Sequence, residues 1–198
     1  MKKNVIKSIL GFSAVLLFAG TVLSGCGKKD SKELSKKEIT VGVTAGPHQQ
    51  IMEEVAKQAK KDGLKIKIKS FTDYNTPNSA LSSGDLDANS YQTIPFLKDQ
   101  IKNKGYKFDL AFKTVAYPMG VYSKKIKSLK NLKDGDSIAV PNDASNETRG
   151  LQLFEKAGII KLKKGVGQTA TKKDVVSNPK HLKIVELEAS QLPKQLRE

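Results

Sequence analysis

The sequence is poor in the residues that build covalent cross-links and metal centres. It contains one cysteine, two histidines and no tryptophan in 198 residues. A single cysteine excludes an intramolecular disulfide framework and a zinc site built from several thiolates. The two histidines, His48 and His181, leave little material for a histidine-rich metal centre. We therefore expect neither a metal nor a cofactor.

Acidic residues are also scarce, since 20 Asp and Glu stand against 35 Lys and Arg, for a net charge of +15. Such an excess is typical of proteins that bind nucleic acid. Of this charge, however, +6 lies in residues 1–37, and the other +9 is spread over residues 38–198 without a long basic run. We interpret it as a solvated basic surface and expect no nucleic-acid partner.

The N-terminus carries a long apolar run, Ile9–Leu23, which follows a basic segment with Lys2, Lys3 and Lys7. In a helix these residues extend about 22 Å, which is short of the roughly 30 Å hydrocarbon core of a bilayer. A basic start, a short apolar run and small residues after it predict a secretory signal peptide.

The apolar run ends in Leu23-Ser24-Gly25-Cys26, which resembles a lipobox. In a lipobox, small residues admit the signal peptidase and the cysteine thiol takes a diacylglycerol. We expect residues 1–25 to be a lipoprotein signal peptide and residues 26–37 to be the lipidated Cys26 and a flexible polar tether. Several acyl chains anchor a protein firmly, so we expect a lipid-anchored protein on the extracytoplasmic face of the cell membrane. An incidental thiol beside a signal anchor is the alternative.

The rest of the chain alternates between strand and helix patterns, which predicts the α/β class. Glu38–Val43 and Leu64–Phe71 have strand patterns, and the amphipathic stretch from Pro47 to Gly63 between them indicates a helix, so this unit favours a parallel strand pair. Further strands are expected at 87–91, 108–115, 137–140 and 182–187. Further helices are expected at 76–81, 94–104, from a cap at Ser145 or Asn146 to Gly158, at 171–176 and at 190–197.

Ligands of α/β sheets bind beyond the carboxyl ends of strands. This rule directs attention to five segments: Thr44–His48, Phe71–Asn75, Asn89–Thr93, Tyr117–Met119 and Pro141–Arg149. Arg149 is one of only two arginines in the chain, and the pattern puts it in the first turn of a helix, where a cation opposes the helix dipole. The planar guanidinium group binds a carboxylate through two hydrogen bonds. Arg149 is therefore a candidate carboxylate-binding residue, and a surface arginine paired with Glu147 or with another neighbour is the alternative.

Several segments resemble the NlpA/MetQ family of methionine-binding lipoproteins, the solute-binding components of methionine ABC importers. These segments are Gly42–Ile51, Phe71–Leu97, Tyr117–Leu129, Ile138–Lys163 and Val185–Pro193. The resemblance implies a two-lobed fold of the periplasmic-binding-protein type II, with lobe 1 at 38–120, lobe 2 at 121–198 and a ligand cleft between them. Family members continue past the segment that matches Gln191-Leu192-Pro193. We therefore expect lobe 1 to be incomplete at the C-terminus, and we expect this chain alone to bind ligand weakly or not at all.

The resemblance also implies the ligand-binding residues. Asn146 and Arg149 match the pair that holds the carboxylate and backbone of the ligand, and Tyr74 and Tyr91 match aromatic residues of the pocket. Gln92, which follows Tyr91, is counted with them. The implied partners are a small amino acid, L-methionine above all, and an ABC permease.

Two departures from the family pattern concern the side-chain pocket. Ser90 stands where the family has an aromatic residue, and Thr93 stands where it has a histidine. Both changes loosen the pocket, so a related amino acid or a short methionine-containing peptide remains open as the ligand.

Other functions are weighed against this one. One alternative is a truncated paralogue that binds nothing, which would explain the missing C-terminal segment of the family. Another is a surface lipoprotein that binds anionic polymers, which rests only on the charge. A membrane-anchored enzyme needs a nucleophile–base pair or a carboxylate dyad. The only cysteine is assigned to lipidation, His48 after Gly46-Pro47 fits a capping or packing role, and Asp85 and Asp87 fit a turn and a strand edge. We therefore expect a binding protein and not an enzyme.

Overall fold

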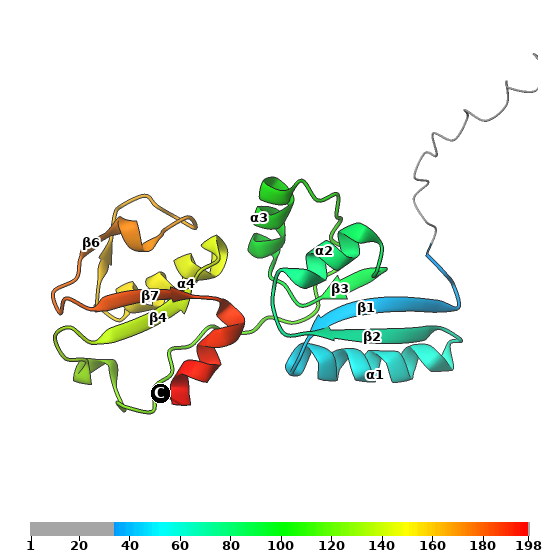
Figure 1. Ribbon diagram of the computed structural model, residues 1–198, viewed down its shortest axis with the longest axis horizontal. Helices are drawn as coiled ribbons and strands as arrows, with labels where there is room; N and C mark the ends of the chain where they lie inside the picture. Colours follow the sequence, from blue (N-terminus) through cyan, green and yellow to red (C-terminus); the bar gives the residue numbers. More distant parts are fainter. Residues whose placement is uncertain (1–33, 198) are drawn as a thin grey trace, which may run out of the picture. The chain divides into compact units, whose positions relative to one another are not determined.

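The computed structural model of the protein describes residues 34–197 (Figure 1). The predicted signal peptide and Cys26 lie outside the described residues. The first sheet is formed by three parallel strands, β1 (Glu38–Thr44), β2 (Lys65–Phe71) and β3 (Ala88–Ser90), in the order β2-β1-β3. The parallel pairing of β1 with β2 confirms the predicted β-α-β unit.

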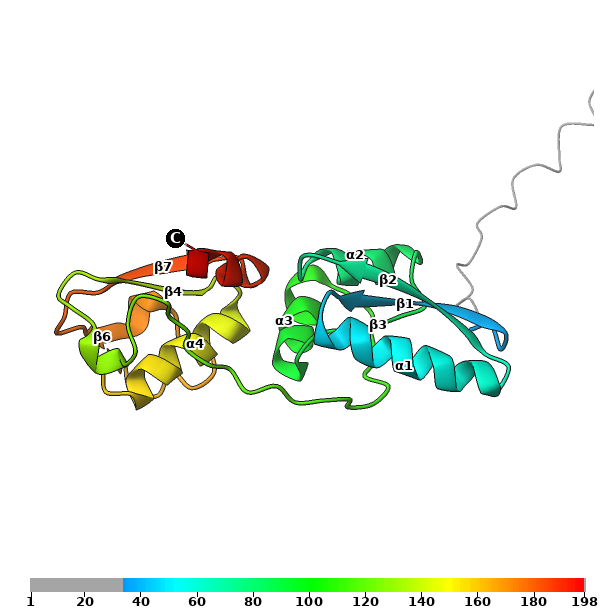
Figure 2. The ribbon, with the colours of Figure 1, turned by 90° about the horizontal axis from the view of Figure 1, so that it is seen from below.

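Three helices accompany this sheet: α1 (Pro47–Lys61), α2 (Thr76–Ser83) and α3 (Ile94–Lys104). Figure 2 shows α1 lying along β1 and β2. The helices α2 and α3 end at Gly84 and Gly105, which both have positive φ angles that glycine adopts without strain. The core of this part is small and includes Val43, Phe71 and Leu86.

The prediction of a strand over 108–115 is wrong, because residues 105–123 form neither helix nor strand. A strand exists only when its backbone N–H and C=O groups pair with a neighbouring strand. No strand among the described residues pairs with this segment. Its apolar side chains are accordingly exposed, and Phe112 is 73% exposed.

The second part of the structure has two small sheets. The strands β4 (Ser137–Pro141) and β7 (Lys183–Leu187) are parallel, and β5 (Lys161–Leu162) and β6 (Val175–Ser177) are antiparallel. The helix α4 (Ala144–Lys156) packs on β4, and short 3₁₀ helices occur at η1 (Leu129–Asn131), η2 (Lys172–Asp174) and η3 (Ala189–Arg197). The apolar core of this part is the larger one: Leu132, Ile138, Val140, Leu151, Phe154, Ile160, Leu162, Ala170 and Leu182.

Two local predictions in this part need correction. The expected helix over 171–176 is a single 3₁₀ turn, Lys172–Asp174, followed by β6, because the β-branched Val175 and Val176 continue as a strand paired with β5. The cap of α4 is neither Ser145 nor Asn146 but Asp143. No helix in the described part of the chain is long and apolar enough to cross a membrane.

Candidate functional site

The start of α4 is organised by the carboxylate of Asp143. Its Oδ1 accepts hydrogen bonds from the backbone N–H of Asn146 at 3.0 Å and from the Asn146 side-chain amide at 3.0 Å. An aspartate at the N-cap satisfies a free N–H of the first helical turn and lies favourably at the positive end of the helix. Asn146, which is only 8% exposed, is thus held in one orientation.

Arg149 lies one turn further along α4 and is half-buried. Its Nη1 donates a hydrogen bond to Oδ1 of Asn146 at 3.0 Å, and its Nη2 donates to the carbonyl oxygen of Tyr117 at 3.4 Å. The structure therefore brings together Asn146 and Arg149, as the sequence predicted, and connects both to Asp143. A guanidinium group has five N–H donors, so Arg149 retains donors for a ligand.

Of the alternative pairings of Arg149, the one with Glu147 is wrong, whereas Arg149 does pair with its neighbour Asn146. The Glu147 side chain is 5% exposed, and its Oε1 accepts a hydrogen bond from the backbone N–H of Lys172 at 2.7 Å. Residues two positions apart on a helix do not face each other, and Glu147 is buried whereas Arg149 is half-buried.

Tyr74 and Tyr91 belong to one aromatic cluster with Phe96. Their ring centroids lie 6.2 Å apart, and each ring also contacts Phe96 at 6.5 Å and 6.2 Å. The Tyr91 hydroxyl group donates a hydrogen bond to the carbonyl oxygen of Tyr74 at 2.8 Å. Burial of the Tyr91 ring, which is 8% exposed, raises the pKa of its hydroxyl group far above the ordinary value.

The Tyr74 ring lies within electrostatic reach of the start of α4. Burial raises the pKa of the Tyr74 hydroxyl group, and the carboxylates of Asp143 and Glu188 raise it further. Asp143 caps α4, and Glu188 directly follows β7. The aromatic cluster and the Asp143–Asn146–Arg149 group therefore belong to the same region.

Gln92 is part of a network of side-chain amides. Its Nε2 donates to Oδ1 of Asn78 at 2.8 Å and to Oδ1 of Asn89 at 3.1 Å, and its Oε1 accepts from Nδ2 of Asn78 at 2.9 Å. Asn78 is completely buried. Both of the Gln92 amide hydrogens are thus used inside the protein, and this network orders the segment that carries Tyr91.

His48 and Tyr117 add a second aromatic contact beside Arg149. The two rings meet edge to face with centroids 5.3 Å apart, and the carbonyl group of Tyr117 is the one that Arg149 contacts. Burial lowers the pKa of the His48 imidazole, because an apolar environment disfavours its charged form. His48 therefore has the packing role that the sequence favoured.

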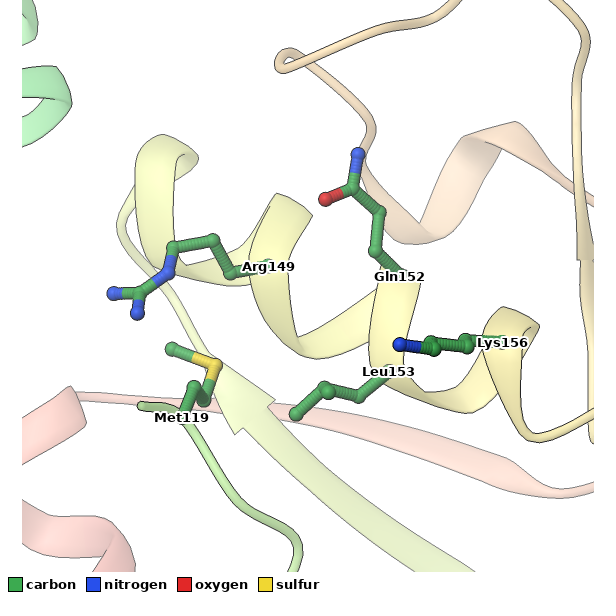
Figure 3. Close-up of a pocket in the computed structure, with 5 residues that line it drawn as sticks. All are labelled: Met119, Arg149, Gln152, Leu153 and Lys156. Carbon is green, nitrogen blue, oxygen red and sulfur yellow. The ribbon is translucent and has the colours of Figure 1, made fainter. Parts of the chain in front are cut away.

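A cavity of about 300 Å³ lies against α4 on the side of Arg149. It is lined by Met119, Arg149, Gln152, Leu153 and Lys156 (Figure 3). Figure 3 shows that four of these side chains come from α4, and that Met119 approaches from the segment before β4. Two cations and two apolar side chains make the cavity suited to a small molecule with a carboxylate and an apolar group.

Sequence reasoning had named the segment Tyr117–Met119, but it missed the cap Asp143 and the α4 residues Gln152, Leu153 and Lys156. Asp143 could have been found, because an N-cap side chain accepts a hydrogen bond from the backbone N–H three residues further along the chain. Asp143 stands at this spacing from Asn146. The others had no local signal. Among residues 34–197, no group of three or more histidine, cysteine or acidic side chains is arranged to hold a metal ion.

The family model described as NlpA lipoprotein matches residues 39–198. Over 187 residues the chain is 52% identical to the D-methionine-binding lipoprotein MetQ of Salmonella typhimurium, and the alignment covers 93% of this chain and 68% of that protein. These matches cover the whole region described above.

Solved structures are also similar. The crystal structure of the methionine-binding protein MetQ superposes with a TM-score of 0.80 at 52% identity, covering 82% of this chain and 66% of that one. A nutrient-binding protein from Burkholderia cenocepacia bound to methionine superposes with a TM-score of 0.78 at 52% identity, covering 81% of this chain and 68% of that one. The chain thus spans about two thirds of the length of these relatives, and the expected fold, a mixed α/β structure of the two-lobed binding-protein type, is confirmed.

Proposed function

The chain belongs to the NlpA lipoprotein family, and we propose on that basis that it is the substrate-binding component of an ABC importer, which captures methionine or a related amino acid. The relatives reported above are named as methionine-binding proteins, and one similar structure is described as bound to methionine. The chemistry at the start of α4 supports the same ligand class.

The observation that carries the proposal is the hydrogen-bonded group Asp143–Asn146–Arg149. Asp143 fixes the Asn146 amide, and Asn146 Oδ1 fixes one Nη of Arg149 at 3.0 Å. The remaining N–H donors of Arg149 bind the ligand carboxylate in two parallel hydrogen bonds. Because the guanidinium group is held before the ligand arrives, little side-chain entropy is lost on binding.

The aromatic cluster holds the side chain of the ligand. Tyr74 and Tyr91 present polarizable rings to a thioether or aliphatic chain, and sulfur contacts with aromatic rings are favourable. Gln92 holds the segment of Tyr91 in place through Asn78 and Asn89. The smaller Ser90 and Thr93 leave room for side chains other than that of methionine.

The location and partners follow from the same proposal. Cys26 carries the lipid that anchors the protein on the extracytoplasmic face of the membrane, and residues 26–37 are the tether. Residues 38–120 and 121–198 form the two lobes, and ligand binding favours the form that an ABC permease recognises. The protein binds its ligand without chemical turnover.

The test is a titration of the chain with L-methionine and D-methionine, followed by ¹⁵N NMR. NMR detects binding as weak as about 1 mM, so the titration covers both tight and weak affinity. We expect saturable shifts of the Asn146 and Arg149 signals, with the same ligand recovered unchanged. An absence of shifts with both enantiomers and with the other natural amino acids contradicts the proposal.

Two variants locate the binding. Arg149→Ala removes the carboxylate contact, and the loss of a desolvated charge pair weakens affinity on the order of 10²-fold or more. Lys61→Ala removes the same charge from an exposed position at the end of α1 and serves as the control, with an expected change under about threefold. Equal losses in the two variants contradict the role assigned to Arg149.

A further inference from the structure

The segment that follows α3 leaves apolar side chains in contact with solvent. Leu110 is 50% exposed, Phe112 is 73% exposed and Val115 is 43% exposed. Figure 2 shows the chain after α3 as a plain trace, and no described strand pairs with it. Apolar side chains that gather on a surface are typical of a site that another molecule covers.

The backbone of this segment is extended, and its hydrogen-bonding groups are free. The rings of Tyr106 and Phe108 stack with centroids 4.8 Å apart and an angle of 22° between their planes. Residues two positions apart point to the same side of an extended chain, so this stacking indicates a strand conformation. Within residues 34–197, no backbone–backbone hydrogen bond involves residues 106–116. The segment therefore presents the unpaired N–H and C=O groups of an edge strand.

The alternating sequence gives the extended segment two unlike faces. One face is apolar and the other carries the charges: Phe108, Leu110 and Phe112 against Asp109, Ala111 and Lys113. Among the described residues, neither Asp109 nor Lys113 has a partner of opposite charge. An unpaired edge of this kind binds an added strand through its backbone, and its side chains select which strand.

The segment is complementary to itself in the antiparallel direction. When two copies pair about a two-fold axis at Ala111, Asp109 of each copy lies opposite Lys113 of the other. Leu110 then lies opposite Phe112 on the apolar face. Opposite charges and apolar residues that lie directly across from each other stabilise an antiparallel pair.

Neighbouring registers lack this complementarity. Moving the axis to Leu110 brings Lys113 opposite Lys107, and like charges directly across destabilise the pair. Moving the axis to Phe112 instead leaves Lys113 opposite Ala111. The sequence therefore favours the axis at Ala111.

We propose that residues 108–114 are a self-association strand, through which two copies of this chain pair antiparallel about Ala111. The inference does not depend on the ligand site. A two-stranded ribbon is marginally stable by itself, and stable complexes bury about 1,200–2,000 Å². The dimer is accordingly weak, with a dissociation constant on the order of 0.1 mM.

Charge reversal tests the register, with sedimentation equilibrium between about 10 μM and 1 mM as the measurement. Asp109→Lys and Lys113→Asp each place like charges across from one another at both crossings, so each should weaken the dimer about tenfold. The double variant D109K/K113D restores opposite charges and should return to within about threefold of the original chain. Lys164→Asp makes the same charge change at an exposed position outside the segment and should have no effect.

Two outcomes of this experiment count against the proposal. A chain that stays monomeric throughout the concentration range overturns it. Single variants that lose the dimer while the double variant does not regain it overturn the register. Association through the apolar run Ile9–Leu23 is common to all of these proteins and does not distinguish them.

The apolar face is tested by Phe112→Ser, which should weaken the dimer about tenfold or more. Tyr122→Ser is the matched control, because Tyr122 is 74% exposed and lies outside the segment. In a mixture of ¹³C-labelled and unlabelled protein, we expect nuclear Overhauser effects between the Leu110 methyl groups of one copy and the Phe112 ring of the other. Their absence at 1 mM overturns the proposal. Phe112 signals that change only when phosphatidylglycerol vesicles are added also overturn it, since a lipid surface is then the occupant.

Discussion

The guanidinium group of Arg149 donates a hydrogen bond from Nη1 to Oδ1 of Asn146 at 3.0 Å. Asp143 in turn accepts a hydrogen bond from the side-chain amide of Asn146. Arg149 is therefore held by a short chain of hydrogen bonds that begins at Asp143. A lysine ammonium group has the same charge but no planar fork. The geometry, and not the charge alone, is therefore the property to test.

Arg149→Lys should weaken ligand binding on the order of 10–100-fold, because one ammonium group cannot serve both Asn146 and a carboxylate bidentately. The measurement is the ¹⁵N NMR titration with methionine. Lys61→Arg, at the exposed end of α1, is the reciprocal control and should leave affinity nearly unchanged. If R149K binds as well as the original chain, charge alone explains the site.

Tyr91→Phe should destabilise the protein by about 1 kcal/mol, because it removes the hydrogen bond to the carbonyl oxygen of Tyr74 inside the aromatic cluster. The free energy of unfolding from urea denaturation measures the effect. Tyr122→Phe makes the same chemical change at a side chain that is 74% exposed, and we expect no change there. Equal effects in the two variants would show that the buried bond contributes nothing.

His48 should make the protein less stable in mild acid. Its pKa in the folded state is lowered by burial, so the unfolded chain binds the proton first, and stability is lost as the pH falls below about 6.5. His48→Gln should reduce this loss, measured as the unfolding midpoint between about pH 7 and pH 5. Each variant is compared with the original chain at the same pH.

Substitution of the other histidine, His181, is the control for this experiment. It lies on the surface, where its Nδ1 is 2.7 Å from Asp134. In the variant His181→Gln, the loss of stability in mild acid that we assign to His48 should remain. A slope that persists in H48Q and vanishes in H181Q would contradict the assignment.

Gly42→Ala should destabilise the first sheet by about 1–3 kcal/mol. A Cβ atom at Gly42 would lie 2.5 Å from Cδ1 of Leu86 and 3.1 Å from Cε2 of Phe71, so buried side chains would have to move. Gly150→Ala on α4 is the matched control, because its nearest atoms lie 3.4–3.5 Å away and alanine favours the helix by up to about 1 kcal/mol. Calorimetric unfolding of the two variants should therefore give changes of opposite sign.

Local patterns predicted the first β-α-β unit and the helices α2, α3 and α4, because periodicity, prolines at helix starts and glycines at helix ends act over a few residues. They failed at 108–115, which alternates like a strand but has no partner strand in the described part of the chain. They also failed at the cap of α4, where Ser145, Asn146 and Asp143 are all suitable residue types. Only the positions of the hydrogen-bonding atoms distinguish these three.

The sequence by itself determined the class of the fold, the lipobox resemblance at Cys26 and the choice of Arg149, because these depend on residue order and rarity. Only the tertiary structure decided which partners the side chains have. It placed Arg149 against the carbonyl group of Tyr117, the Tyr91 hydroxyl group against the carbonyl group of Tyr74, and Glu147 against the backbone N–H of Lys172. The residues of each pair are 17 to 32 positions apart, and the folding of the chain brings them together. Burial, which raises the pKa of Glu147, is likewise a property of the packed chain and not of its neighbours in sequence.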